Sequence, residues 1–280
     1  MRTFIRRPGN KSKYLKHILP LFPKSYNTYI EPFVGSGAVF LNIRPTKWII
    51  NDINKDIINI WKSVQHDPSN LINLFEIFSK HFKPLNIKQK KLYCQLLTDQ
   101  ISSINYNYDR ASLYLLMSYV AYIGHIMRNG KFYFPGLDKN LNYENLFFLS
   151  ESYKKNLFNI SNYLKTSNGM ILNQDYKQIL KKAKSGDFVF LDPPYVENHN
   201  YQLNYSINEN ITEDFISSLL LELKKLDSKN IKWMMTQADT KFIRKLFKDY
   251  YVSEFTVFRG YTNSYKNELI IRNYDTVLPV

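Results

Sequence analysis

Cysteine is nearly absent from this chain of 280 residues, in which Cys94 is the single example. One cysteine excludes an internal disulfide framework and a zinc site built from several cysteines, and it fits a reducing intracellular compartment. Cys94 lies in a predicted helix among leucines and a tyrosine, where a thiol is typically packed and inert. We therefore expect an intracellular protein whose chemistry does not use the thiol.

Long apolar runs are also missing. The longest apolar stretches, such as residues 112–123, are interrupted by Ser and Tyr and are too short to span a bilayer. No signal-peptide core follows Met1. With only 9 glycines and 11 prolines, the composition is not that of a collagen, a low-complexity chain or a disordered chain. We expect a soluble globular protein that does not bind a membrane.

Acidic residues are too few to balance the basic ones. The chain has 24 Asp and Glu against 38 Lys and Arg, a net charge of +14. A basic surface attracts polyphosphates by releasing their counterions, so nucleic acid is the leading class of partner. An ordinary solvated surface, an acidic lipid or an acidic protein would also fit, and charge alone does not decide between them.

Strand-like and helix-like segments alternate along much of the chain. Short runs of β-branched and aromatic residues predict strands at residues 28–34, 48–53, 171–174, 188–191, 231–236, 252–258 and 268–272. Amphipathic patterns between them predict helices at residues 12–21, 37–43, 55–64, 176–183, 212–226 and 240–248. Such alternation is typical of an α/β protein with a parallel sheet.

The middle of the chain has a different pattern. Three helical runs, at residues 71–80, 88–98 and 111–122, are followed by a loop rich in Gly, Asn and aromatic residues. We therefore expect three parts, with residues 1–64 and 151–280 forming one sheet domain and residues 65–150 forming a mainly helical insert.

A glycine-containing turn follows the first predicted strand. Residues 31–37 lead through Gly35 and Gly37 into a predicted helix, and Asp52 ends the next predicted strand. Glycines let such a turn tighten and let a ligand approach the backbone, while an acid in that place can accept from a ribose diol. A tight turn without a ligand uses the same residues. A nicotinamide cofactor is disfavoured, because Phe40 stands where the dinucleotide fingerprint needs its third glycine.

An acid, two prolines and an aromatic residue follow the buried strand at residues 188–191. Asp192 precedes Pro193 and Pro194, which have no backbone N–H, so the loop can only accept hydrogen bonds. An exocyclic amino group needs such acceptors, and Tyr195 can stack on its ring. The alternative is a proline-rich loop that simply caps the strand, with the tyrosine packed.

Taken in order, these motifs resemble those of the Dam-like adenine-N6 DNA methyltransferases. The match comprises Arg7-Pro8-Gly9-Asn10-Lys11, the turn of Phe33, Gly35 and Gly37, Asn51-Asp52, the helical insert, Asn173-Gln174-Asp175-Tyr176, Asp192-Pro193-Pro194-Tyr195 and Asn267-Glu268. The resemblance implies a Rossmann-like methyltransferase sheet whose helical insert is the target-recognition domain. It implies methyl transfer from S-adenosylmethionine to N6 of an adenine flipped out of duplex DNA. The alternatives are a non-catalytic nucleic-acid-binding protein on the same fold and a methyltransferase acting on RNA or on cytosine N4.

The resemblance also implies roles for single residues. Lys11 would lie beside the methionine carboxylate of the cofactor, and Asp52 would accept from the ribose hydroxyls. Arg7 occupies a position that is usually aromatic in the family. The cofactor site as a whole would comprise Arg7, Lys11, Pro32, Phe33, Gly35, Ser36, Gly37, Asp52, Ile53, Asp175, Tyr176 and Asp192, with Asp175 and Tyr176 at the adenine ring. The catalytic residues would be Asp192, Pro193, Pro194 and Tyr195, with the carboxylate and the first proline carbonyl holding the target amino group.

Residues 122–136 resemble the recognition hairpin of the family. Arg128 would fork onto a guanine edge, and Lys131 would meet a phosphate. Alternatively, Asn129-Gly130 is simply a hairpin turn and the flanking aromatic residues are core. The predicted DNA-binding residues are Arg128, Asn129, Lys131, Pro135 and Lys139.

The expected partner is double-stranded DNA, a cognate restriction endonuclease is a possible second one, and the protein itself is expected to be a monomer or a weak dimer. No metal is assigned, since His199 has no second His or Cys at ligand spacing.

Overall fold

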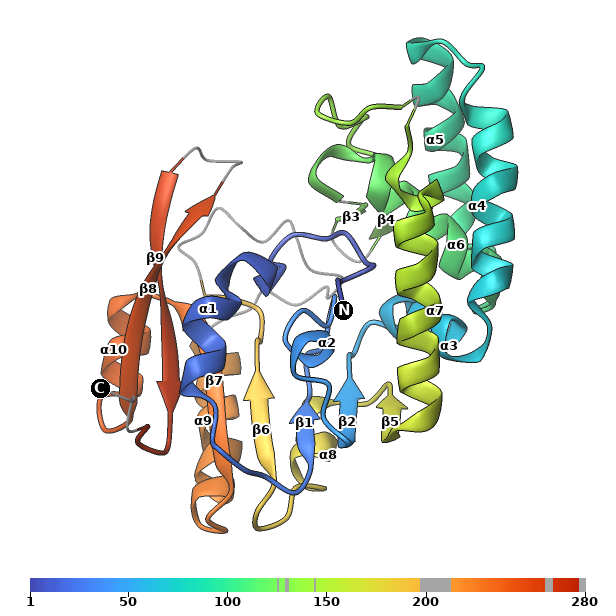
Figure 1. The fold of residues 1–280 in the computed structure, drawn as a ribbon. Coiled ribbons are helices and arrows are strands. Elements are labelled where there is room, and N and C mark those ends of the chain that lie inside the picture. The colour runs from blue at the N-terminus through green and yellow to red at the C-terminus, as the bar shows by residue number, and fades with distance from the viewer. Residues whose placement is uncertain (125, 129–130, 144, 197–212, 260–263, 277–280) are drawn as a thin grey trace.

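Seven strands form one sheet in the computed structural model, which describes residues 1–124, 126–128, 131–143, 145–196, 213–259 and 264–276 (Figure 1). The strands are β1 (Tyr29–Glu31), β2 (Lys47–Asn51), β5 (Asn168–Leu172), β6 (Phe188–Leu191), β7 (Lys232–Ala238), β8 (Tyr251–Arg259) and β9 (Ser264–Arg272). Their order across the sheet is β5-β2-β1-β6-β7-β9-β8. The first five are parallel, and β9 runs antiparallel to both β7 and β8. The expected Rossmann-like α/β sheet is confirmed.

The central strands of the sheet are buried on both faces, and their successive side chains alternate between two cores. In β6, Phe188 and Phe190 join a core with α1 (Leu15–Ile18), α2 (Phe40–Ile43), α3 (Lys55–His66) and α7 (Glu151–Thr166). Val189 and Leu191 join a second core with α8 (Tyr176–Leu180), α9 (Glu213–Asp227) and α10 (Lys241–Leu246). A strand buried on both faces has a continuous apolar run, which is why the sequence identifies β6 so clearly. None of the described helices is long and apolar enough to cross a membrane.

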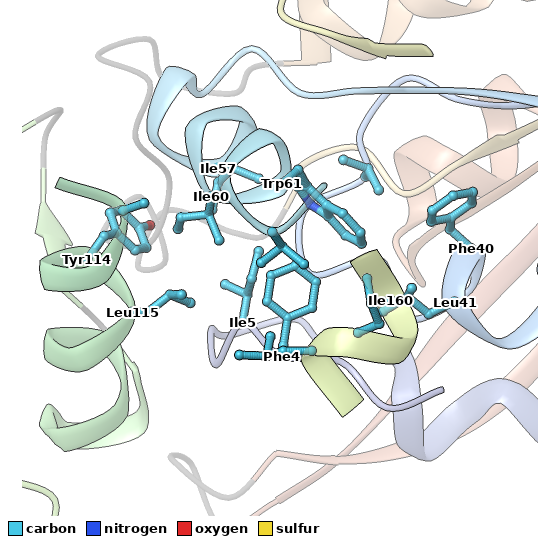
Figure 2. Packing of buried hydrophobic residues seen from close by; sticks show 14 of the residues in the cluster. Phe4, Ile5, Phe40, Leu41, Ile57, Ile60, Trp61, Tyr114, Leu115 and Ile160 are labelled. Atoms are coloured by element: carbon cyan, nitrogen blue, oxygen red, sulfur yellow. The ribbon is translucent and has the colours of Figure 1, made fainter. Parts of the chain in front are cut away.

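The helical insert packs beside α3 and α7 and shares the first of these cores (Figure 1). It contains α4 (Pro68–Phe82), α5 (Ile87–Ile101) and α6 (Tyr108–Val120), then the short strands β3 (Met127–Arg128) and β4 (Lys131–Phe132). Figure 2 shows Leu115 of α6, Ile60 of α3 and Ile5 of the N-terminal segment within one cluster. The three expected helices are confirmed. The division of the chain at residues 64 and 150 stays a prediction.

Side-chain caps set where the insert helices begin. Asp67 ends α3 and caps α4, with Pro68 in the first turn, where its missing N–H costs nothing. At the start of α5, Asn86 and Gln89 bond each other's backbone amides as a capping box.

Helix α7 was missed by the sequence analysis. Ser150 caps it, accepting from the amide of Tyr153, and its buried residues recur at helical spacing: Tyr153, Leu157, Ile160, Ser161 and Leu164. Both signals are visible in the sequence. Elsewhere the predicted helix at 12–21 is three short segments, Lys11–Tyr14, Leu15–Ile18 and Leu19–Leu21, and the predicted strand at 171–174 begins earlier, as β5.

Candidate active site

The predicted site residues lie in loops at one edge of the sheet. β1, β2, β5 and β6 are parallel, so the segments that follow them meet where the carboxyl ends of these strands lie side by side. The glycine turn follows β1, Asp52 follows β2, Asp175 follows β5 and Asp192 follows β6. The topology therefore brings four motifs together that are up to about 160 residues apart in the sequence.

The turn after β1 requires its glycines. Gly35 and Gly37 have φ of +47° and +66°, a region that non-glycine residues seldom adopt. A Cβ on Gly37 would lie 2.4 Å from Cζ2 of Trp61 in α3. The indole N–H of Trp61 donates to the carbonyl of Gly35 at 3.0 Å. The Trp61 ring therefore occupies the space that a side chain at position 37 would need, and its N–H holds the turn by a hydrogen bond.

Two asparagines join the loops after β1, β2 and β5. The amide of Asn51 donates to the carbonyls of Pro32 and Gln174, and its oxygen accepts from the backbone N–H of Gln174. Asn173 donates to the carbonyls of Asp52 and Ile53 at 2.8 and 3.0 Å. The sequence analysis gave neither asparagine a role of its own, although both lie in motifs that it quoted.

Asp52 organises the same turn. Its carboxylate accepts from the backbone N–H of Gly35 at 3.0 Å and from that of Asn54 at 2.9 Å. Burial raises its pKa, while the nearby charge of Arg7 and these two amide donors act in the opposite direction. The carboxylate is half-buried, and its oxygens can accept a further hydrogen bond from a ligand. Its neighbour Ile53 is exposed.

Three aromatic rings cluster beside the turn. The ring centroids of Phe33 and Tyr176 are 5.5 Å apart, and Phe215 of α9 completes the group at 6.4 and 5.5 Å from them. Sequence reasoning missed Phe215. Asp175 is exposed and caps α8 by accepting from the amide of Lys177 at 2.8 Å.

Asp192 is held by two donors on the same oxygen. The hydroxyl of Thr236 in β7 donates to Oδ1 at 2.6 Å, and Nζ of Lys11 lies 3.0 Å from that oxygen. Lys11 is buried, and its ammonium also donates to the carbonyl of Gly9 at 3.2 Å. An ion pair this far from solvent is screened weakly, so it fixes the rotamer of the carboxylate. The sequence gave no reason to expect Thr236.

Tyr195 is fixed by Glu268 of β9. Its hydroxyl donates to Oε2 of Glu268 at 2.8 Å, and the ammonium of Lys11 lies 4.7 Å from the centre of its ring. Burial, with the charges of Glu268 and Asp192, raises the pKa of Tyr195 well above its ordinary value, so the hydroxyl stays protonated. Gln237 of β7 donates to the carbonyl of Pro194 and accepts from the amide of Val196. These contacts hold the proline loop against β7 and β9.

Of the predicted DNA-binding residues, two lie opposite each other in a hairpin. β3 and β4 are antiparallel, with Arg128 opposite Lys131. Asn129 lies outside the described residues. Lys131 and Lys139 are exposed, and Pro135 is half-buried.

Two other features bear on the chemistry. Cys94 is buried, and burial raises the pKa of its thiol to about 12, which leaves it unreactive as the sequence analysis expects. Among the described residues, no group of three or more His, Cys, Asp or Glu could hold a metal ion.

Comparison with known proteins decides the family. The sequence model of the D12 class N6 adenine-specific DNA methyltransferases matches residues 8–264. The chain belongs to this family. It is therefore an adenine-specific DNA methyltransferase, as the resemblance implied.

Three methyltransferases are similar to this chain over most of its length. A type II methyltransferase of Lactococcus lactis subsp. cremoris, M1.LlaDCHI, is 29% identical over 98% of this chain and 96% of its own length. The type II methyltransferase M.MjaIII of Methanocaldococcus jannaschii is 26% identical over 91% of this chain and 90% of its own. The DNA adenine methylase of Haemophilus influenzae is 25% identical over 88% and 82%.

Proposed function

We propose that this methyltransferase is site-specific and that it transfers a methyl group from S-adenosylmethionine to N6 of an adenine flipped out of duplex DNA. The proposal rests on which of the two carboxylate oxygens of Asp192 is already engaged by the protein. Lys11 and Thr236 both engage Oδ1, and within the described residues no donor reaches Oδ2. One carboxylate oxygen is thus anchored, and the other is left to accept from a substrate.

The next residue supplies a second acceptor. Pro193 and Pro194 have no N–H, so this loop offers only oxygens. Gln237 engages the carbonyl of Pro194, whereas that of Pro193 has no donor in the described part of the chain. An amino group has two N–H bonds, and here it finds two acceptors. Holding both would favour a pyramidal nitrogen whose lone pair is free to attack.

The residues at this edge fit the cofactor. Two of the four buried side-chain atoms that lack a hydrogen-bond partner among the described residues, Nη1 of Arg7 and Oε1 of Gln174, lie here. Bound S-adenosylmethionine would supply an electrophilic methyl group on a sulfonium. Asp52 would accept from its ribose hydroxyls, and the rings of Phe33 and Tyr176 would pack against its adenine, with Asp175 beside them. Pro32, Gly35, Ser36, Gly37 and Ile53 would form the surrounding wall.

Tyr195 has an aromatic ring that could stack on a flipped base, and a hydrogen bond from its hydroxyl holds that ring in place. Extruding a base costs a few kcal/mol, and an aromatic face in the pocket can replace part of the lost stacking. The bond to Glu268 keeps the ring from rotating away. No covalent intermediate with the protein is needed. As the amino nitrogen bonded to the methyl carbon, the bond from that carbon to the sulfonium would break and S-adenosylhomocysteine would leave, and the nitrogen would then lose a proton to solvent.

The hairpin and the basic charge support sequence-specific binding of duplex DNA. We assign base reading to Arg128 and Asn129, phosphate contact to Lys131, and further contacts to Pro135 and Lys139. The names of similar proteins include type II methyltransferases and a modification methylase, so a cognate restriction endonuclease is part of the proposal. We propose a monomer or weak dimer inside the cell.

The test is the identity of the methylated base. Unmodified duplex DNA is incubated with the protein and labelled S-adenosylmethionine, then digested to nucleosides, which are separated. We expect label in N6-methyladenine, and its near-complete loss in Asp192→Ala. Asp249→Ala, an exposed carboxylate, is the control and should keep the activity. Undiminished label in a folded Asp192→Ala variant would refute the assigned mechanism.

A further inference from the structure

Arg7 lies over the glycine turn with an unused donor. A Cβ on Gly35 would lie 3.7 Å from its Nη1 and 4.0 Å from its Cζ. Nη1 is buried and has no hydrogen-bond partner within the described residues. A buried guanidinium N–H that bonds nothing is costly, which indicates that a ligand completes it.

The backbone around Arg7 is held firmly. Phe4 and Ile5 are buried, and the hydroxyl of Tyr153 donates to the carbonyl of Phe4 at 3.0 Å. Arg6 pairs with Asp138 and donates to the carbonyl of Tyr119 at 2.6 Å. These contacts fix the backbone from which the side chain of Arg7 extends, between the insert and the turn.

Asp52 does not satisfy this guanidinium. Its oxygens accept from the amides of Gly35 and Asn54, and no hydrogen bond joins it to Arg7 in the described structure. The arginine acts on it only through space, opposing the effect of burial on the pKa of Asp52. The buried Tyr114 of α6 feels the same charge. Arg7 thus contributes a positive charge to the turn that no acidic side chain engages by a hydrogen bond within the described residues.

The other candidate cation is already engaged. The resemblance assigns the cofactor carboxylate to Lys11, but the ammonium of Lys11 lies 3.0 Å from Oδ1 of Asp192. Binding a second carboxylate there would compete with the group that positions the target base. We propose that Arg7 binds the carboxylate of the amino-acid end of S-adenosylmethionine, an inference that rests on the proposed function.

The chemistry of arginine suits this role. Its planar fork can donate two parallel hydrogen bonds to a carboxylate, and its charge does not titrate. Gly35 has no side chain, which leaves the space above the turn open for the ligand.

Calorimetry with two ligands tests the assignment without relying on turnover. S-adenosylhomocysteine carries the carboxylate, whereas 5′-methylthioadenosine keeps the nucleoside and sulfur and lacks the amino-acid end. Arg7→Gln should raise the Kd of S-adenosylhomocysteine about 10- to 100-fold. It should leave that of 5′-methylthioadenosine within about twofold. Arg2→Gln, an exposed arginine five residues away, is the matched control and should change neither.

Each other outcome has a distinct meaning. An equal loss for both ligands would show that Arg7 acts on the nucleoside end through Asp52, and no loss for either would remove it from the site; both overturn the inference. Failure of the wild-type protein to bind S-adenosylhomocysteine at all would instead refute the proposed cofactor. A crystal structure of that complex checks the contact itself, because a carboxylate beyond hydrogen-bond reach of Arg7 would exclude it.

Discussion

The ammonium of Lys11 lies 3.0 Å from Oδ1 of Asp192 and 4.0 Å from Oε2 of Glu268, so one buried cation lies between acidic residues from two separate parts of the sheet. Asp192 follows β6 and Glu268 lies in β9, an antiparallel strand some 76 residues further on. Without the cation, two carboxylates would face each other in a poorly solvated site, where like charges repel strongly. The lysine therefore places a positive charge between these two acidic side chains.

Lys11→Met should slow methyl transfer about 10- to 100-fold at saturating cofactor and DNA, because Asp192 loses the partner that fixes its rotamer. Single-turnover rates measure this effect. The control is Lys13→Met, an exposed lysine in the same short helix, which should keep the wild-type rate. Equal rates for the two variants would mean that Lys11 does not position Asp192.

The sequence predicted which segments meet at this edge of the sheet better than it predicted the contacts between their side chains. The glycine turn, Asp52 and Asp192 follow strands whose apolar runs are evident, so a parallel sheet had to bring them to one edge. Thr236 and Phe215 were missed, since which side chain of a later element faces the site depends on the register and packing of that element.

Glu268 belongs to a motif on which the family resemblance rests, but the sequence analysis gave it no role. It is a carboxylate at the start of a buried run, Leu269 to Arg272, and a buried acid is rarely found without a partner. That its partner is Tyr195 follows from the pairing of β9 with β7, a contact between segments far apart in the chain. Helix α7 is a different case, because its cap at Ser150 and its regular apolar spacing are both present in the sequence.

Glu31→Gln should stabilise the protein at pH 8 and lose that advantage near pH 4. Burial raises the pKa of Glu31 well above its ordinary value, and the charges of Asp192 and Asp52 add to the effect. A raised folded-state pKa means that the wild-type protein binds more protons than its unfolded chain, so stability falls as pH rises through the folded value. Glutamine keeps an acceptor for the hydroxyl of Tyr29, which lies 2.7 Å from Glu31.

Urea denaturation at the two pH values measures the Glu31 effect. Glu76→Gln, at an exposed position of α4, is the control and should show little dependence on pH. If Glu31→Gln raised the free energy of unfolding by the same amount at both pH values, ionisation of Glu31 would not be the cause.

Gly37→Ala should cost about 2–4 kcal/mol of folding free energy, since alanine is strained at positive φ and its Cβ would overlap the Trp61 ring. Gly9→Ala separates the backbone strain from the overlap with Trp61. Gly9 has φ of +80° but no atom within 4 Å of its ideal Cβ. This substitution should cost about 1–2 kcal/mol. Urea titration of both variants is the measurement, and an equal cost would mean that the indole ring yields freely.

Arg128→Ala and Lys131→Ala should separate base reading from backbone contact. The two residues are paired in the register of β3 and β4, so both would reach the same stretch of DNA if this hairpin binds it as proposed. A base-reading arginine contributes about 1–3 kcal/mol of discrimination at one position, whereas a phosphate contact weakens binding to every sequence and lowers the salt slope by about one. We expect Arg128→Ala to relax sequence preference in a library of methylated duplexes, and Lys131→Ala to preserve it. Uniform loss of methylation across the library in Arg128→Ala would reassign that arginine to the backbone.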